Sequence, residues 1–180
     1  SGGVTVAGIT IDVDGNTRNV TTPDIGADEF TGILLDLVGP AITYTNLANT
    51  SSTGDRVLSV SVTDASGVPT AGVGLPVIYY RKNAGAYAST QCSFVSGSNY
   101  DCSIVAASLG GVTLADVIGY YVAAQDSAPT PNVSVNPSTG AAGLTANPPA
   151  AATPPTTPNT YTIVGAASGT YLVGTGQTYT

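Results

Sequence analysis

The stretch Val57-Leu58-Ser59-Val60-Ser61-Val62-Thr63 alternates aliphatic and hydroxyl side chains along its whole length. Successive side chains of a β-strand point to opposite faces of a sheet, so this stretch predicts a strand with one buried and one exposed face. The turn-forming residues Asp64-Ala65-Ser66-Gly67 follow it directly. Residues 117–124 alternate in the same way, with Ile118, Tyr120, Val122 and Ala124 on one face.

Other short strands are expected at the spacing typical of a β-sandwich. They cover residues 41–45, 75–82, 86–90, 92–95, 100–105 and 132–135. No helix is expected beyond one short turn within residues 108–116. The sequence therefore predicts an all-β protein whose body, residues 40–144, is an immunoglobulin-like β-sandwich.

The flanking segments have a different composition. Residues 1–39 are interpreted as the terminal segment of a preceding β-module, with strands at 4–11 and 33–38. Residues 145–160, TANPPAAATPPTTPNT, predict an extended linker because proline removes backbone donors and favours polyproline II. Residues 161–180 return to strand composition and are interpreted as the start of a following module or as a strand that pairs with another subunit.

The charge and composition exclude several classes of function. The 180 residues include 4 Lys plus Arg against 11 Asp plus Glu, no His, no Met and no Trp, and the net charge is -7. Without histidine there is no Ser-His-Asp or Cys-His catalysis, and so few basic residues give no electrostatic footprint for nucleic acid or an anionic membrane. Only 8% of the residues are charged, against about 25% in ordinary domains, which favours an extracellular location.

Two further expectations concern the chain as a whole. No stretch approaches 18 consecutive apolar residues, so no transmembrane helix is predicted. Because the sequence lacks methionine altogether, we expect a processed product or a piece of a longer chain.

The two cysteines, Cys92 and Cys102, flank a turn signal at Ser96-Gly97-Ser98-Asn99. A hairpin centred there would place the two sulfur atoms opposite each other. The sequence therefore predicts a disulfide, which implies an oxidising location, with two free buried thiols as the alternative.

Three segments resemble known modules. Ile11-Asp12-Val13-Asp14-Gly15-Asn16-Thr17-Arg18, followed by Pro23-Asp24-Ile25-Gly26-Ala27-Asp28-Glu29-Phe30, resembles the DxDGxxR…PDIGAxE closing motif of secreted right-handed β-helix proteins common in Bacteroidota. Pro40 to Tyr44, Thr63 to Gly67, Tyr79 to Lys82 and Gly119 to Asp126 resemble the immunoglobulin-like modules that follow such helices. Ser168 to Thr180 is similar to the opening of another β-helix-type module. The resemblance implies one slice of a long multi-module surface or secreted protein, typically an adhesin.

Two groups of acidic residues are candidate sites. Asp12, Asp14 and Asn16 present oxygen atoms at alternate positions, as calcium loops do. The alternative is a turn in which aspartate side chains bind backbone amides and Arg18 pairs with Asp24, Asp28 or Glu29. Asp28 and Glu29 are poorly placed as a glycosidase pair, because adjacent residues of a strand point to opposite faces.

Tyrosines and hydroxyl groups supply the candidate surface sites. Tyr79-Tyr80 and Tyr120-Tyr121 lie on expected central strands, so one ring of each pair should be buried and the other exposed to a partner or a sugar ring. Tyr171 and Tyr179 extend this candidate surface in the C-terminal segment. Ser127, within Asp126-Ser127-Ala128, matches a bacterial O-glycosylation acceptor, while the sequons at Asn19, Asn49 and Asn132 are frequent by chance in a chain so rich in Ser and Thr.

These observations predict a non-enzymatic structural or adhesive module of a surface adhesin or fibre. Its expected partners are further copies of itself or adjacent modules of the same chain, with no cofactor other than calcium. A carbohydrate-binding accessory module of a secreted glycan-degrading enzyme is the alternative. A third reading is a filament subunit that inserts residues 161–180 into a neighbour, in which case a chain without them would fold but not polymerise.

Overall fold

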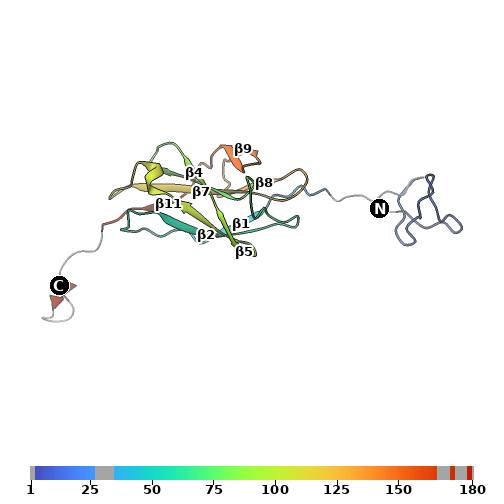
Figure 1. The fold of residues 1–180 in the computed structure, drawn as a ribbon, viewed down its shortest axis with the longest axis horizontal. Coiled ribbons are helices and arrows are strands. Elements are labelled where there is room, and N and C mark those ends of the chain that lie inside the picture. Colours follow the sequence, from blue (N-terminus) through green and yellow to red (C-terminus); the bar gives the residue numbers. More distant parts are fainter. Residues whose placement is uncertain (1–2, 27–34, 166–170, 173–177, 180) are drawn as a thin grey trace. The chain divides into compact units, whose positions relative to one another are not determined.

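The structure is a computed structural model, which describes residues 3–26, 35–165, 171–172 and 178–179. The chain divides into two compact units, Ser1–Leu35 and Asp36–Thr180. The second unit contains the sandwich, and Figure 1 shows its strands in two layers. None of the helices among the described residues has the length and hydropathy needed to cross a bilayer.

Four strands form the first sheet in the order β1-β2-β6-β5, all antiparallel. Their bounds are β1 Ala41–Tyr44, β2 Arg56–Thr63, β5 Ser93–Ser96 and β6 Asn99–Ile104. Strand β2 follows its alternating sequence: Leu58, Val60 and Val62 are buried, while Ser59 and Thr63 face solvent.

The second sheet has the order β11-β7-β3-β4, and β8 also pairs with β7. Its strands are β3 Val77–Lys82, β4 Ala88–Gln91, β7 Val117–Gln125, β8 Val133–Asn136 and β11 Asn159–Thr162. A single 3-10 turn, Ala106–Leu109, lies between β6 and β7. The prediction of an all-β sandwich is therefore confirmed.

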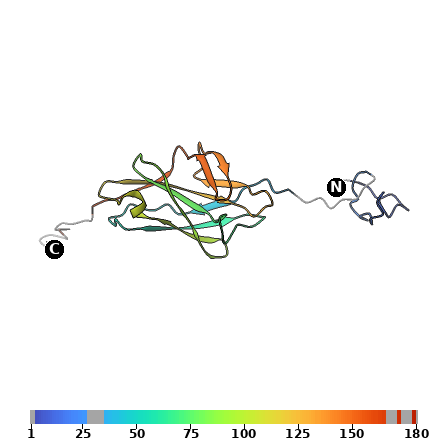
Figure 2. The ribbon, with the colours of Figure 1, turned by 45° about the horizontal axis from the view of Figure 1, so that its top comes forward.

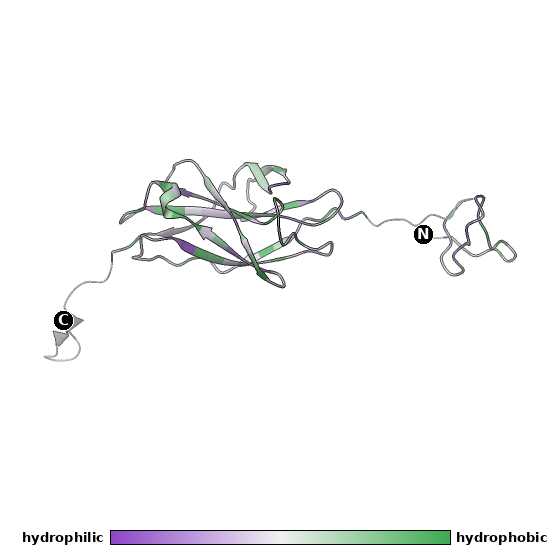
Figure 3. Ribbon diagram, in the orientation of Figure 1, coloured by the Kyte–Doolittle hydropathy of each residue, from purple (hydrophilic) through white to green (hydrophobic). Residues whose placement is uncertain are grey.

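The two sheets pack face to face over one hydrophobic core. Leu58, Val60 and Tyr100 come from the first sheet, and Ile78 and Tyr120 come from the second. All five are at most 2% exposed. The strands of both sheets carry hydrophobic stretches in Figure 3, and the view in Figure 2 shows the same two layers turned.

The disulfide lies where the chain passes from one sheet to the other. Strand β4 ends at Gln91 in the second sheet, and β5 begins at Ser93 in the first. Between them the Cys92 amide donates to the Pro76 carbonyl at 2.7 Å, and the Cys92 and Cys102 Sγ atoms lie 1.97 Å apart. The predicted hairpin register is confirmed, since Phe94 pairs with Tyr100 across the turn at Gly97.

Residues 145–160 differ from the predicted linker. Strand β9, Ala142–Thr145, and strand β10, Ala150–Thr153, form a hairpin, and β11 is a full member of the second sheet. Pro149 and Pro155 are buried. The reason is that β7 is apolar on both faces, so the outer face of the second sheet needs a cover, which this segment supplies.

The flanks also differ from their predicted boundaries. Among the described residues of the first unit, the only strand pairing is an isolated bridge between Ile11 and Thr17, so residues 4–11 are not a strand. Residues 35–38 carry no strand either, and residues 33–34 lie outside the described part. Tyr161 and Ile163 are 3% and 2% exposed in the core, so the sandwich extends past residue 160. Beyond it, Tyr171–Leu172 (β12) pairs with Thr178–Tyr179 (β13).

Candidate functional site

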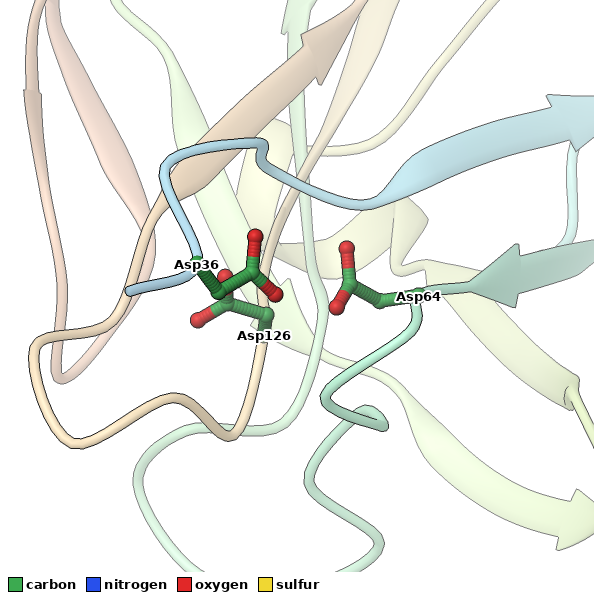
Figure 4. A group of neighbouring side chains, drawn as sticks. All are labelled: Asp36, Asp64 and Asp126. Carbon is green, nitrogen blue, oxygen red and sulfur yellow. The ribbon is translucent and has the colours of Figure 1, made fainter. Parts of the chain in front are cut away.

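Three aspartates from separate parts of the chain converge at one end of the sandwich (Figure 4). Asp36 precedes β1, Asp64 follows β2 and Asp126 follows β7. One carboxylate oxygen from each lies within 4.8 Å of the others. We call this group the aspartate cluster; within the described residues it is the one group of three acidic side chains close enough to hold a metal ion.

Local turns orient the three carboxylates. Asp64 Oδ1 accepts the Ser66 amide at 2.7 Å, and Ser66 Oγ donates to Asp36 Oδ2. Asp126, which is 0% exposed, accepts hydrogen bonds from the Asn132 amide at 2.9 Å and from Asn132 Nδ2 at 2.7 Å. These donors are all neutral, so the hydrogen bonds leave three negative charges close together.

The electrostatics of the cluster differ between its members. Burial, followed by the negative charges of Asp36 and Asp126, raises the pKa of the Asp64 carboxyl above its ordinary value. The hydrogen bond from Ser66, followed by that from the Val38 amide, lowers the pKa of Asp36. A cation would remove the repulsion, and carboxylate oxygens are the ligands that hard divalent cations prefer.

The predicted calcium loop is held by hydrogen bonds of its own. Asp12 Oδ1 accepts the amides of Asp14 at 2.9 Å and Asn16 at 2.7 Å, and Asp12 Oδ2 accepts Asn16 Nδ2 at 3.0 Å. Arg18 Nη2 donates to the carbonyl oxygens of Asp24 and Gly26 at 2.9 and 3.1 Å. The loop thus has the turn geometry that was the alternative to a metal site. Asp28 and Glu29 lie outside the described residues.

Each Tyr-Tyr pair was expected to bury one ring and expose the other, and the structure buries one ring of each pair, Tyr80 and Tyr120, but does not expose Tyr121. Tyr80, Tyr120 and Tyr121 are at most 1% exposed, and Tyr79 is half-buried. Tyr80 and Tyr120 face the sandwich core, and Tyr120 Oη accepts the Leu47 amide at 2.8 Å. The main chains of Tyr171 and Tyr179 pair with each other, and their side chains lie outside the described part.

A second, smaller cluster buries the outer tyrosine rings. Tyr79 stacks on Tyr121 with ring centroids 4.9 Å apart, and Tyr87 meets Tyr121 edge-on at 5.2 Å. Ala151 of β10 and Ala141, which precedes β9, pack against them, and Tyr79 Oη donates to the Pro149 carbonyl at 3.1 Å. Burial, followed by the phenols of Tyr79 and Tyr87, raises the pKa of Tyr121.

Ser127 is exposed, as its predicted role requires. Its neighbour Asp126 is fully buried, with one carboxylate oxygen accepting the Ala128 amide at 3.2 Å. An enzyme that reads the aspartate of this motif would not reach it on the folded sandwich. Asn132, in one of the sequons, directs its amide nitrogen to the Asp36 carbonyl at 3.0 Å as well as to Asp126.

Sequence reasoning missed the aspartate cluster because each member was assigned to a local role. Asp64 fitted a turn, Asp126 a modification motif and Asp36 a strand. One signal was available, since Asp64 and Asp126 each directly follow a strand with a buried apolar face. The order of the strands brings these two strand ends together with Asp36, and no local stretch of sequence predicts that order.

Comparison with known proteins adds no identity: no protein-family model matches the chain, and no curated protein is significantly similar to it.

Proposed function

We propose that the chain is a non-enzymatic structural segment of an extracellular surface adhesin or fibre. One observation carries this proposal: the chain enters the sandwich at one end, near Asp36, and leaves it at the opposite end, after β11 (Figure 1). A separate compact unit precedes it. Modules whose two ends lie at opposite poles join into extended chains without folding back on one another.

The chemistry of the sandwich supports an extracellular setting. The bonded cysteines, 2% and 0% exposed, sit in the core at the crossing between sheets. Disulfides persist in oxidising compartments and are rare in the cytosol. The low content of charged residues, 8%, agrees with this setting.

The first unit supports attachment to a further β-module. Its aliphatic side chains are exposed by 55% to 85%, whereas Asp12 and Asp24 are 7% and 9% exposed. The exposed members are Val4, Val6, Ile9, Ile11, Val13, Val20 and Ile25. A surface of this kind is normally covered in the assembled protein. We therefore infer that residues 3–26 pack against another module, as the resemblance to a β-helix closing segment implies.

The carbohydrate-binding alternative depends on exposed aromatic rings beside polar groups. Of the two rings expected on that surface, Tyr121 is buried and Tyr79 is half-buried. The central strands therefore favour the structural proposal over this alternative. The filament alternative requires residues 161–180 to insert into a neighbouring subunit. Tyr161 and Ile163 belong instead to the core of their own sandwich, so the start of that segment is not free to insert.

Protease shaving of intact cells tests the extracellular assignment. We expect an externally added protease to remove an epitope on this chain while a cytosolic marker protein stays intact. Cells lysed in an alkylating agent should yield Cys92 and Cys102 unlabelled until reductant is added. An epitope that is protected in intact cells, with both thiols freely alkylated, would overturn the proposal.

The size of the native material tests the modular assignment. Under denaturing and reducing conditions we expect a mass many times the 17.8 kDa of these residues. A mass near 17.8 kDa together with fibres in electron micrographs would instead identify a short polymerising subunit.

Calcium enters the proposal at the aspartate cluster rather than at the Asp12 loop. Calcium takes about six to eight oxygen ligands, of which three carboxylates supply the charged share and carbonyls or water the rest. Such an ion would fasten Asp36, the first residue of the sandwich unit, to the ends of β2 and β7.

Calcium titration of the Asp64→Asn variant tests this site. In wild type we expect saturating Ca²⁺ to raise the melting temperature by about 5–10 °C over the value in EDTA. Asp64→Asn should abolish this rise, whereas Asp14→Asn, the matched change in the Asp12 loop, should retain it. A rise that survives Asp64→Asn and disappears in Asp14→Asn would move the ion to the first unit.

The pH dependence in EDTA gives an independent readout of the same group. Because the folded state raises the pKa of Asp64, its ionised form destabilises the fold at neutral pH. This destabilisation fades as pH falls through the raised folded pKa toward the ordinary value of 3.8. Without calcium, the Asp64→Asn variant should therefore have a higher melting temperature than wild type at pH 7. The two melting temperatures should converge below the ordinary pKa of 3.8. A variant that melts lower at pH 7 in EDTA would contradict the assigned repulsion.

A further inference from the structure

The chain segment that enters the sandwich runs alongside the segments that end it. Side chains join the first part, since Asn136 Nδ2 donates to the Ile42 carbonyl at 2.6 Å and Tyr44 Oη donates to the Asn136 carbonyl at 2.6 Å. Asn159 Nδ2, on β11, donates to Tyr44 Oη at 2.9 Å. These contacts bind β1, a strand of the first sheet, to β8 and β11 of the second.

Main-chain bonds continue the contact beyond β1. The Thr50 amide donates to the Thr162 carbonyl at 3.1 Å, and the Val164 amide donates to the Thr50 carbonyl at 2.8 Å. Asn49 Oδ1 accepts the Thr162 amide at 2.9 Å. We use the name terminal seam for this contact. One side is residues 42–50, and the other is their partners on β8, on β11 and at residues 163–164.

The two sides of the seam run in the same direction. Thr50 and Ile163 form a parallel bridge, whereas the strand pairs within the sandwich sheets are antiparallel. Because the chain enters at one pole and leaves at the other, a pull on both ends draws the two sides of the seam in opposite directions along their length (Figure 1). The hydrogen bonds that join the two sides then lie across the direction of the pull. The force loads all of them at once instead of one after another.

The last residues of the seam are anchored in the core of the sandwich. Tyr161 and Ile163 are 3% and 2% exposed, and the Arg56 guanidinium lies 4.7 Å from the centre of the Tyr161 ring. The Ile163 main chain is bonded on its other side as well, to the Ala115 amide at 2.8 Å and the Asp116 carbonyl at 2.9 Å. A segment whose side chains are buried and whose main chain is bonded on both sides opens only together with its neighbours.

We propose that the terminal seam is a tension-bearing clamp, which lets the sandwich resist force applied between its two ends. This inference rests on the proposed function, because only a module within an extended chain is pulled from both poles. The resistance of the clamp depends on the direction of the force. It is high when the two sides are pulled past each other and low when they are peeled apart from the end at Thr50 and Val164.

Single-molecule pulling on the full chain in two geometries tests the clamp. In the first, handles are attached at the two chain ends, which loads the seam in shear. In the second, one handle is attached by thiol-free chemistry at Thr53 and the other at the C-terminal end, which peels the seam from residue 50 inward. At equal loading rate we expect the sandwich to unfold at a force at least about twofold higher in the first geometry.

A matched pair of variants tests the role of the seam itself. Asn49→Ala removes one side-chain bond to a main-chain group within the seam, and Gln91→Ala removes one outside it, Nε2 to the Gly72 carbonyl at 2.8 Å. Both side chains belong to exposed residues. We expect Asn49→Ala to lower the end-to-end unfolding force and Gln91→Ala to leave it unchanged, with similar melting temperatures for the two.

Equal forces in the two geometries, or equal losses in the two variants, would overturn the clamp. Neither result would touch the extracellular assignment, which rests on protease shaving and thiol labelling. Conversely, a chain found inside the cell could still show the directional force, so the two proposals fail separately.

Discussion

We expect a chain that ends after Thr160 not to fold and a chain that ends after Gly165 to fold. The shorter chain loses Tyr161 and Ile163, which are 3% and 2% exposed in the sandwich core. Emptying an aromatic and an aliphatic core site costs about 5–10 kcal/mol together. That sum is comparable to the whole stability of an ordinary domain, about 5–15 kcal/mol. The shorter chain also loses the main-chain bonds that join Thr50 to Thr162 and Val164.

Circular dichroism and thermal melting distinguish the two chains. We expect a cooperative transition for residues 1–165 and none for residues 1–160. The single substitution Tyr161→Ala in the full chain serves as a milder control, expected to lower stability by about 3–5 kcal/mol. A cooperative melt from residues 1–160 would contradict the assignment of β11 to this sandwich. It would restore the view that residues 161–180 are free to pair with a neighbour.

Loss of the disulfide has the second large effect. The bond between Cys92 and Cys102 closes a short loop, with a sequence separation of 10. In the chain-entropy account a bond of this span contributes about 3 kcal/mol, by limiting the unfolded ensemble. At this chain length that corresponds to a fall of roughly 6–12 °C in melting temperature. We expect this fall when wild type is reduced, and again in the double variant Cys92→Ala/Cys102→Ala.

The double variant is also the control for the reductant. Its melting temperature should be the same with and without reducing agent, while that of wild type should shift. Alanine avoids placing a hydroxyl group in the core, where both cysteines are at most 2% exposed. A wild-type melting temperature that does not respond to full reduction, verified by thiol counting, would contradict a structural role for the bond.

Most strands of the sandwich could be predicted because their signals are local. Residues 57–63 alternate between buried and exposed side chains, and they form β2 with this pattern intact. The turn at Gly97 between the cysteines sets the register that pairs Phe94 with Tyr100. In such places a few adjacent residues carry enough chemistry to define a strand or a hairpin.

The errors arose where a non-local contact outweighs local composition. The sequence TANPPAAATPPTTPNT is typical of a linker, yet Pro149 and Pro155 are buried, and Ala151 packs against the tyrosine cluster of the second sheet. The cause lies elsewhere, in Tyr79, Tyr87 and Tyr121, whose rings would otherwise face water. The apolar run of β7 was a signal that both of its faces are covered, although not of what covers them.

The sequence by itself determined that the protein is all-β and where most of its strands lie, and it placed the two cysteines where a hairpin could join them. Each of these follows from side-chain alternation or turn chemistry within about ten residues. Only the tertiary structure decided that Asp36, Asp64 and Asp126 meet, that Tyr120 is a core residue and that the first and last strands run together as a seam. These depend on strand order and on which faces are covered, and such contacts join residues up to 115 positions apart.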